Sequence, residues 1–382
     1  MEANRFRLTP LMRHFGRSIP SAVGAVVLVF LLTGCNSEQV RHSETLAVLN
    51  TVAWSPDGTQ IAAGRNIFNL VFLYDAKTMV RSAVLAGHEE DNWGRLSARS
   101  LTYSPDGRYV AAAGIDHITV VWDVRTGSEV LRLDALSETA AVAFAPRSNV
   151  LAAGGPGNTV TLWRIPEGLQ FASLAQPSRT RSLAFSPEGE LLAVGGSDHA
   201  VRIWRVKDTA LAASLSPLGF PVTGLAFSPD GDTLAVYGGV LTLWRGVKTA
   251  QGPYFPDTVN RDEIDNSGGI AGFVESLNRR APAAFTLLDI ATERSNLALN
   301  GRYDELPLVF SNDGRFFAIM RYKPWGIYLN EILVFERPDG SVVSIHCTCF
   351  SMAFSPDSQQ LVTVGNGLSL WDPATGQPMA RK

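Results

Sequence analysis

The chain repeats one short pattern about every 40 residues, in which an apolar strand ends in a Trp-Asp-like pair. The eight copies end at Asp75, Asp123, Arg164, Arg205, Arg245, Asp289, Glu336 and Asp372. A unit of this size cannot bury its own apolar face, so such units must stack on one another. The sequence therefore predicts a repeat architecture.

A second repeated mark comes before most of these positions, roughly half a period earlier, and joins a short apolar strand to a tight turn. It occurs seven times, as in VAWSPDG or LAFSPDG, beginning at Val52, Leu101, Val142, Leu183, Leu225, Leu308 and Met352. Pro fixes φ at about −65°, Asp bonds to its own backbone and Gly accepts positive φ, so the mark indicates a hairpin corner. With the strands that follow, each unit predicts four antiparallel strands, which make up one propeller blade.

Three segments of the chain resemble the WD-repeat propellers: LAGH at 85–88, GIDHITVVWDVRTG at 114–127 and LSLWDPATG at 368–376. The resemblance extends from about residue 44 to the C-terminus. It implies an all-β fold, a closed propeller of four-stranded antiparallel blades.

The resemblance also implies a hydrogen-bonded structural network of His88, Asp116 and Trp122. The family's Ser or Thr is missing from it, because this chain has Ala112 and Ala113 in the preceding strand.

The two repeated marks disagree on the number of blades. The fifth and sixth turn marks are separated by two periods instead of one, and Asp289 precedes Phe310 by the same spacing that links the second unit to the third. This spacing favours eight blades, with residues 285–290 as a third strand in a degenerate blade at 246–290. A seven-bladed ring with a long insertion there is the alternative. In either ring, residues 44–49 can serve as the outer strand of the last blade.

The N-terminus has the form of an export signal. Four arginines precede an uncharged run that ends in LTGC at Cys35; they are Arg5, Arg7, Arg13 and Arg17. The apolar core of this run is shorter than the roughly 20 residues of a spanning helix. LTGC resembles the lipobox of bacterial lipoproteins, which implies cleavage before Cys35 and a lipid on that residue; an uncleaved anchor with an incidental Cys is the alternative. The sequence thus predicts a signal peptide at 1–34, a tether at 35–43 and the propeller at 44–382.

Charge restricts the partners of the mature chain. Removal of residues 1–34 takes away four Arg and one Glu, leaving 29 basic and 35 acidic residues and a net charge of −6. Without a basic stripe such a chain is poorly suited to nucleic acid or anionic membranes. We expect a monomer that touches the membrane only through lipid on Cys35. Asn36 stands where an Asp would resemble an inner-membrane retention signal, which favours the outer membrane, facing the periplasm, in a Gram-negative cell.

The sequence contains no recognisable catalytic motif. The glycines at 154–157 end a strand with no helix behind them, and the chain has neither a GxSxG elbow nor an HExxH helix. The acidic run at 257–265 lacks the pattern of a calcium loop. We therefore expect neither enzymatic activity nor a cofactor.

Cys347 and Cys349, in SIHCTCFSM, leave three interpretations open. They can pack in the core, they can form a disulfide at the cost of some distortion, or they can join His346 and Met352 in a soft-metal site.

Two loops lengthen the repeat on one face of the predicted ring, opposite the SPDG corners. Their aromatic and charged side chains are typical of binding hot spots, although they can instead fold back onto the ring. The candidate partner-binding residues are Glu90, Asp91, Trp93, Tyr322, Trp325 and Tyr328. Our leading hypothesis is a non-catalytic, lipid-anchored interaction platform for an envelope protein or peptide. The alternatives are an enzyme or small-ligand binder using the central funnel, and an envelope or outer-membrane assembly factor.

Overall fold

Short, mainly apolar runs form the strands of this protein, as the sequence predicts, and some of them, such as Leu191–Gly196, are buried along their whole length. The computed structural model describes residues 48–65, 70–87, 98–114, 118–134, 141–215, 221–238, 241–245, 247, 256–257, 308–322, 330–336 and 341–381. All of them belong to one compact unit, Ala47–Lys382. In this described part of the chain, no helix is long and apolar enough to cross a membrane.

The described strands form seven four-stranded antiparallel sheets, and the chain completes each sheet before it starts the next. The strands of the first four sheets are β1 Leu49–Trp54, β2 Gln60–Arg65, β3 Val71–Asp75 and β4 Arg81–Leu85; β5 Ala98–Tyr103, β6 Tyr109–Gly114, β7 Ile118–Asp123 and β8 Glu129–Asp134; β9 Ala141–Phe144, β10 Val150–Gly154, β11 Thr159–Arg164 and β12 Leu169–Ala175; β13 Thr180–Phe185, β14 Leu191–Gly196, β15 Val201–Arg205 and β16 Leu211–Leu215.

The last three sheets follow the same order. Their strands are β17 Gly224–Phe227, β18 Thr233–Tyr237, β19 Leu241–Arg245 and β20 Pro256–Asp257; β21 Leu308–Phe310, β22 Phe316–Tyr322, β23 Asn330–Glu336 and β24 Val342–Cys347; β25 Cys349–Phe354, β26 Leu361–Gly365, β27 Leu368–Trp371 and β28 Pro378–Arg381.

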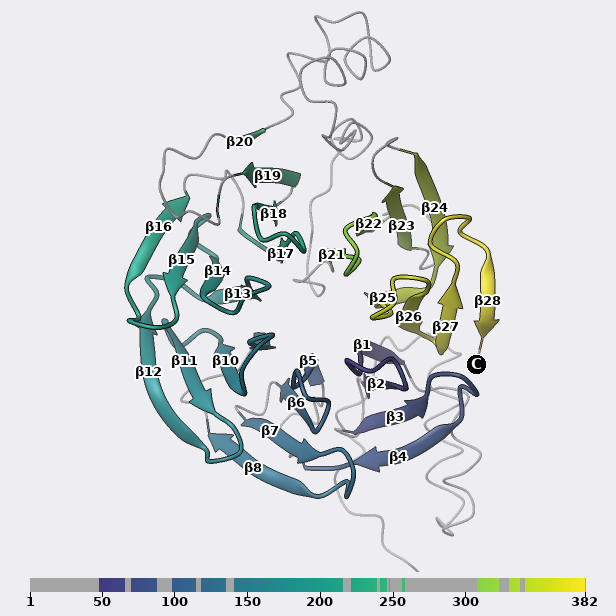
Figure 1. Cartoon of the computed structure of the whole chain (residues 1–382), viewed down its shortest axis with the longest axis horizontal. Coiled ribbons are helices and arrows are strands. Elements are labelled where there is room, and N and C mark those ends of the chain that lie inside the picture. Colours follow the sequence, from purple (N-terminus) through teal and green to yellow (C-terminus); the bar gives the residue numbers. More distant parts are fainter. Residues whose placement is uncertain are drawn as a thin grey trace, which may run out of the picture. The chain divides into compact units, whose positions relative to one another are not determined.

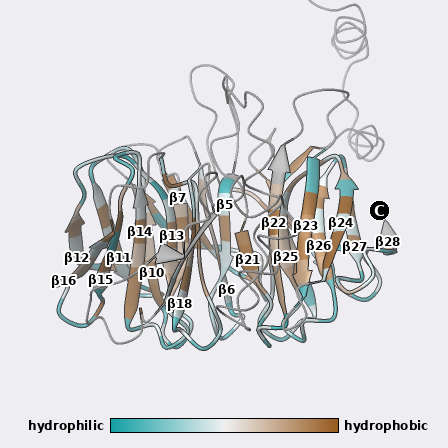
Figure 2. Ribbon diagram, turned by 90° about the horizontal axis from the view of Figure 1, so that it is seen from above, coloured by the Kyte–Doolittle hydropathy of each residue, from teal (hydrophilic) through white to brown (hydrophobic). Residues whose placement is uncertain are grey.

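The seven sheets stand around a common centre, with the first strand of each innermost and the fourth outermost (Figure 1). Neighbouring innermost strands contact one another in chain order from β1 to β25, and β25 contacts β1. Apolar residues line the strands, as the brown segments of Figure 2 show.

The hydrophobic core lies between neighbouring sheets rather than within one. Leu73 of the first sheet and Trp122 of the second share one cluster, and Ile61 of the first sheet shares another with Val362 of the seventh. All four side chains are fully or almost fully buried. Each sheet therefore depends on its neighbours for burial, which is the physical reason for the repeat.

The outer strand of the seventh sheet is the segment that directly follows β27 in the sequence, so the predicted role of residues 44–49 as that outer strand is wrong. The outer strand is β28, which pairs with β27. Gly376 N–H donates to Asp372 O at 2.8 Å and turns the chain back toward this edge. Leu49 instead begins β1, an innermost strand.

The segment predicted as a strand of an eighth blade, 285–290, lies outside the described residues, so eight blades stays a prediction. Within 246–290 the structure describes β20, which pairs with β19 as the fourth strand of the fifth sheet. The innermost strands on either side of this region, β17 and β21, contact each other directly.

Candidate interaction face

The ring of sheets has two faces of different construction. The corners between first and second strands lie on one face, which we call the turn face; they are residues 55–58, 104–107, 145–148, 186–189, 228–231, 311–314 and 355–358. On the opposite face, the connection face, second strands turn into third strands and each fourth strand crosses to the next sheet, because antiparallel strands alternate in direction.

The turn-face corners are built as the SPDG pattern predicts. Ser55 Oγ donates to Asp57 Oδ1 at 2.6 Å and accepts the Gln60 N–H at 2.9 Å, so the buried hydroxyl is satisfied twice. Gly58 has φ of 73°, in the left-handed region that glycine favours. Asp57 also accepts the Thr59 N–H at 3.0 Å. The bond from Ser55, followed by that from Thr59, lowers the pKa of Asp57 below its ordinary value.

Each corner also lies against its neighbour. A Cβ placed on Gly107 would lie 3.6 Å from Pro56, and one on Gly58 would lie 3.7 Å from Pro356 of the seventh sheet. Asn312 Nδ2 donates to Pro356 O at 3.1 Å and links the sixth corner to the seventh. The turn face is thus an interlocked set of small, hydrogen-bonded turns.

The connection face carries a polar cluster where the third sheet meets the fourth. Ser178 Oγ donates to Asp198 Oδ1 at 2.8 Å, and Arg202 Nη2 donates to Asp198 Oδ2 at 2.6 Å. Arg181 Nε donates to Ser197 Oγ at 2.8 Å. Burial raises the pKa of Asp198, but the bonds from Arg202 and Ser178 outweigh it, so the net pKa is lowered and the carboxylate stays ionised.

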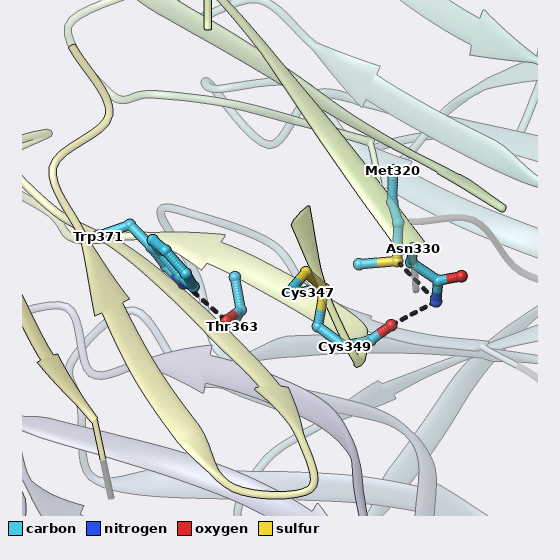
Figure 3. The surroundings of a disulfide bond; sticks show 6 residues. All are labelled: Met320, Asn330, Cys347, Cys349, Thr363 and Trp371. Atoms are coloured by element: carbon cyan, nitrogen blue, oxygen red, sulfur yellow. Dashed lines mark hydrogen bonds between the residues drawn. A yellow bond between two sulfur atoms is a disulfide. The ribbon is translucent and has the colours of Figure 1, made fainter. Parts of the chain in front are cut away.

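A second cluster occupies the connection face where the sixth sheet meets the seventh, and it contains the cysteine pair. Cys347 ends β24, Cys349 begins β25, and their sulfurs form a disulfide (Figure 3). Asn330 Nδ2 donates to Cys349 O at 2.5 Å. Cys349 is 2% exposed and packs with Met352 in a hydrophobic cluster, whereas Cys347 is partly buried.

The structure therefore selects the disulfide among the three interpretations of the cysteines. It also shows Cys349 in the core. No group of three or more His, Cys, Asp or Glu side chains that could hold a metal occurs in the described ranges.

Beside the disulfide lies a buried carboxylate that sequence reasoning missed. Glu331 is 5% exposed, and Ser344 Oγ donates to its Oε1 at 2.5 Å. His346 Nε2 lies 3.9 Å from the same oxygen and is itself exposed. The sequence signal was available, because Asn330 and Glu331 are polar residues that directly precede the apolar run ILVF in the strand NEILVFE.

Of the six candidate partner-binding residues, the structure describes Tyr322 alone. Glu90, Asp91, Trp93, Trp325 and Tyr328 lie outside the described residues, as does the lipidation candidate Cys35. Tyr322 ends β22, where its backbone pairs with Asn330. The strands that flank both loops end on the connection face, so the prediction that the loops share a face stays consistent with the described topology.

Of the predicted network, the structure describes Trp122 alone, while His88 and Asp116 lie outside the described part of the chain. Trp122 is fully buried, and its Nε1 donates to Ala86 O at 2.7 Å. A Trp–Thr pair that the sequence analysis missed occurs in the seventh sheet, where Trp371 Nε1 donates to Thr363 Oγ1 at 2.9 Å (Figure 3).

Two segments of the chain, residues 80–123 and 172–205, match the family described as WD domain, G-beta repeat. Each runs from the outer strand of one sheet through the third strand of the next, so each includes a crossing on the connection face. A comparison with curated proteins found no match. The two matches and the seven four-stranded sheets support a WD-repeat propeller. Propellers of this class are typically non-enzymatic scaffolds for protein–protein interaction.

Proposed function

We propose that this protein is an exported, lipid-anchored WD-repeat propeller that acts as a non-catalytic platform for an envelope protein or peptide. The observation that carries the proposal is the combination of two WD-repeat matches with seven four-stranded sheets stacked through shared hydrophobic clusters. A rigid ring of this kind offers a large fixed surface, and its loops can vary without disturbing the core.

We further propose that seven blades close the ring. Support comes from the cyclic order of contacts between innermost strands, which includes β25 with β1 and β17 with β21. The turn-face contact between Gly314 and Pro229 bridges the same place at which an eighth blade would have to fit.

Docking is proposed on the connection face, with Trp93, Trp325 and their charged neighbours as contacts. The lengths of the crossings support this choice. Twelve residues separate β4 from β5, although hairpin loops and similar connections need about 2 to 6. Length beyond that has no structural requirement and is available for recognition.

In-cell photocrosslinking from both faces tests the platform. A benzophenone side chain would replace Asn158 or His346 on the connection face and, as the matched control, Lys77 or Lys207 on the turn face; all four positions are exposed. We expect the same partner to be captured from the first pair and not from the second. Capture from the turn-face pair alone would overturn the proposed docking face.

The anchor has a separate test, because it rests on the LTGC sequence at Cys35. Cys35→Ala should yield a precursor that incorporates no fatty acid and keeps its leader. If the variant is still labelled with fatty acid and matures to the wild-type size, the lipoprotein assignment is wrong.

A further inference from the structure

The crossing from the sixth sheet to the seventh is the shortest of its kind among the described sheets. One residue, Thr348, separates β24 from β25, whereas at least four residues separate the outer strand from the next inner strand at every other crossing between them. The Cys347–Cys349 disulfide spans this single residue.

A bond in this position does little for the stability of the fold. The entropic stabilisation from a disulfide grows with the number of residues that it encloses, and this one encloses Thr348 alone. Both ends are already fixed by backbone pairing, since Cys347 pairs with Asn330 and Cys349 pairs with Gly365. Entropic stabilisation of the fold therefore does not account for this disulfide, and its role is better sought in the reactivity of the two sulfurs.

The two sulfur-bearing residues differ in their access to solvent. Cys347 is partly buried and follows the exposed His346 at the end of an outer strand. Cys349 is 2% exposed, and the core cluster around it contains Met320 and Met352. An incoming thiolate can thus approach Cys347 more readily than Cys349, and access is one of the factors that sets the rate of thiol–disulfide exchange.

We propose that Cys347 and Cys349 form a thiol–disulfide exchange site that takes two electrons from a dithiol. A thiolate of the dithiol attacks Sγ of Cys347, the Cys347–Cys349 bond breaks, and Cys349 leaves as a thiolate that takes up a proton. The second thiol of the dithiol, after losing its proton, then attacks the mixed disulfide and releases Cys347 as a thiolate, which is protonated in turn. The dithiol is oxidised to a disulfide and the protein pair is reduced to two thiols, so atoms and electrons balance.

The surroundings connect the redox state of this pair to the junction between the two sheets. Asn330 Nδ2 bonds to the carbonyl of Cys349, and Asn330 Oδ1 is buried without a hydrogen-bond partner (Figure 3). The Thr348 carbonyl lies against Gly365 so closely that a Cβ there would collide with it. Opening the disulfide removes the covalent constraint from this packed crossing on the connection face.

A redox titration tests the site in the full chain carrying Cys35→Ala, so that only this pair can react. The protein would be equilibrated with mixtures of reduced and oxidised dithiothreitol, alkylated and weighed by mass spectrometry, with circular dichroism recorded in parallel. We expect both thiols to appear together in one reversible two-electron transition while the β-sheet spectrum is retained. Reduction only after denaturant unfolds the chain, or two free thiols in air-oxidised protein, would overturn the proposal.

Matched single variants test which sulfur is attacked. In the same background, Cys349→Ser leaves the thiol of Cys347 and Cys347→Ser leaves that of Cys349. Reaction with an aromatic disulfide reagent should be at least about tenfold faster for the Cys347 thiol in the folded protein, because it is the more accessible thiol. The two rates should become equal in denaturant. Equal rates in the folded state, or a faster Cys349, would contradict attack at Cys347.

Discussion

The turn face and the connection face of the ring differ in how regularly their polar groups are arranged. On the turn face, the corner serines are buried and doubly hydrogen-bonded, as at Ser104, which donates to Asp106 and accepts the Tyr109 N–H. On the connection face, several buried side-chain atoms of described residues have no hydrogen-bond partner. These atoms are Asn50 Oδ1, Thr119 Oγ1, Gln176 Nε2, Thr180 Oγ1, Arg202 Nη1 and Asn330 Oδ1. Three further such atoms belong to residues at strand ends next to the turn face: Tyr103 Oη, Trp204 Nε1 and Trp244 Nε1.

The comparison shows which face keeps the same local structure from one sheet to the next. Six of the seven turn-face corners begin with a buried serine, and neighbouring corners contact one another, as Gly107 does with Pro56 and Gly58 with Pro356. The crossings on the connection face range from one residue between β24 and β25 to twelve between β4 and β5 and still longer between β20 and β21. A face that need not repeat is free to acquire binding residues, while the repeated face keeps the sheets in place.

The largest expected effect concerns binding on the connection face. Trp93→Ala or Trp325→Ala should weaken partner capture by about 2 kcal/mol or more, because truncated aromatic hot spots typically cost that much. Capture yield and melting temperature would be measured together. Joint loss of capture and stability would show that the tryptophans support the fold, and unchanged capture in the double variant would move docking to another surface.

The free energy of unfolding should depend more on hydrogen bonds of the turn face than on those of the connection face. Ser104→Ala removes the acceptor for the Tyr109 N–H and should lower the free energy of unfolding by about 1 to 2 kcal/mol, since a buried donor loses its partner. Urea unfolding would measure the change. The third corner already has Ala145 at the equivalent position, which makes Ala145→Ser the matched control with little expected loss. A negligible effect of Ser104→Ala would remove the basis for treating this face as the fixed one.

The corresponding change on the connection face should have the smaller effect and the opposite sign. Thr180 is fully buried and its hydroxyl has no partner, so Thr180→Val replaces an unsatisfied oxygen by a methyl group of similar size. We expect the free energy of unfolding to stay the same or to rise by up to about 1 kcal/mol. A loss as large as that of Ser104→Ala would mean that the two faces are equally constrained.

The smallest effect should come from protonation at the turn face. Hydrogen bonds from Ser55 and Thr59 lower the pKa of Asp57 from its ordinary value of 3.8. The ionised carboxylate therefore stabilises the fold at pH values above that ordinary pKa. That contribution is lost as the pH falls through the lower, folded-state pKa. Asp57→Asn should therefore lose less stability than the wild type between about pH 5 and pH 3. Parallel pH profiles for the two proteins would contradict this assignment.

The sequence analysis was most successful where the chain repeats. The seven strand-and-turn marks each became a corner of one sheet, because Ser, Pro, Asp and Gly act on the backbone within a few residues of their own position. It failed at residues 44–49, where an apolar pattern is compatible with either an outer or an inner strand. The competing segment Pro378–Arg381, just after the final turn, took the outer edge of the seventh sheet.

The candidate site was less predictable than the fold. Charged and aromatic residues predicted two loops as binding sites. The contacts of Glu331 with Ser344 and of Asn330 with Cys349 could not be predicted in this way, because they depend on which strands pair and in which register. Sequence spacing alone left the cysteines with three interpretations.

By itself, the sequence determined the all-β repeat, the four-strand unit and the hairpin corners, because these follow from local periodicity and turn chemistry. Only the tertiary structure decided that β28 completes the seventh sheet, that Trp122 bonds to the carbonyl of Ala86, and that Cys347 is joined to Cys349 beside Asn330. The physical reason is that these features join residues through packing and backbone register between strands. Such choices are settled by the free energy of the whole ring and leave no local mark in the sequence.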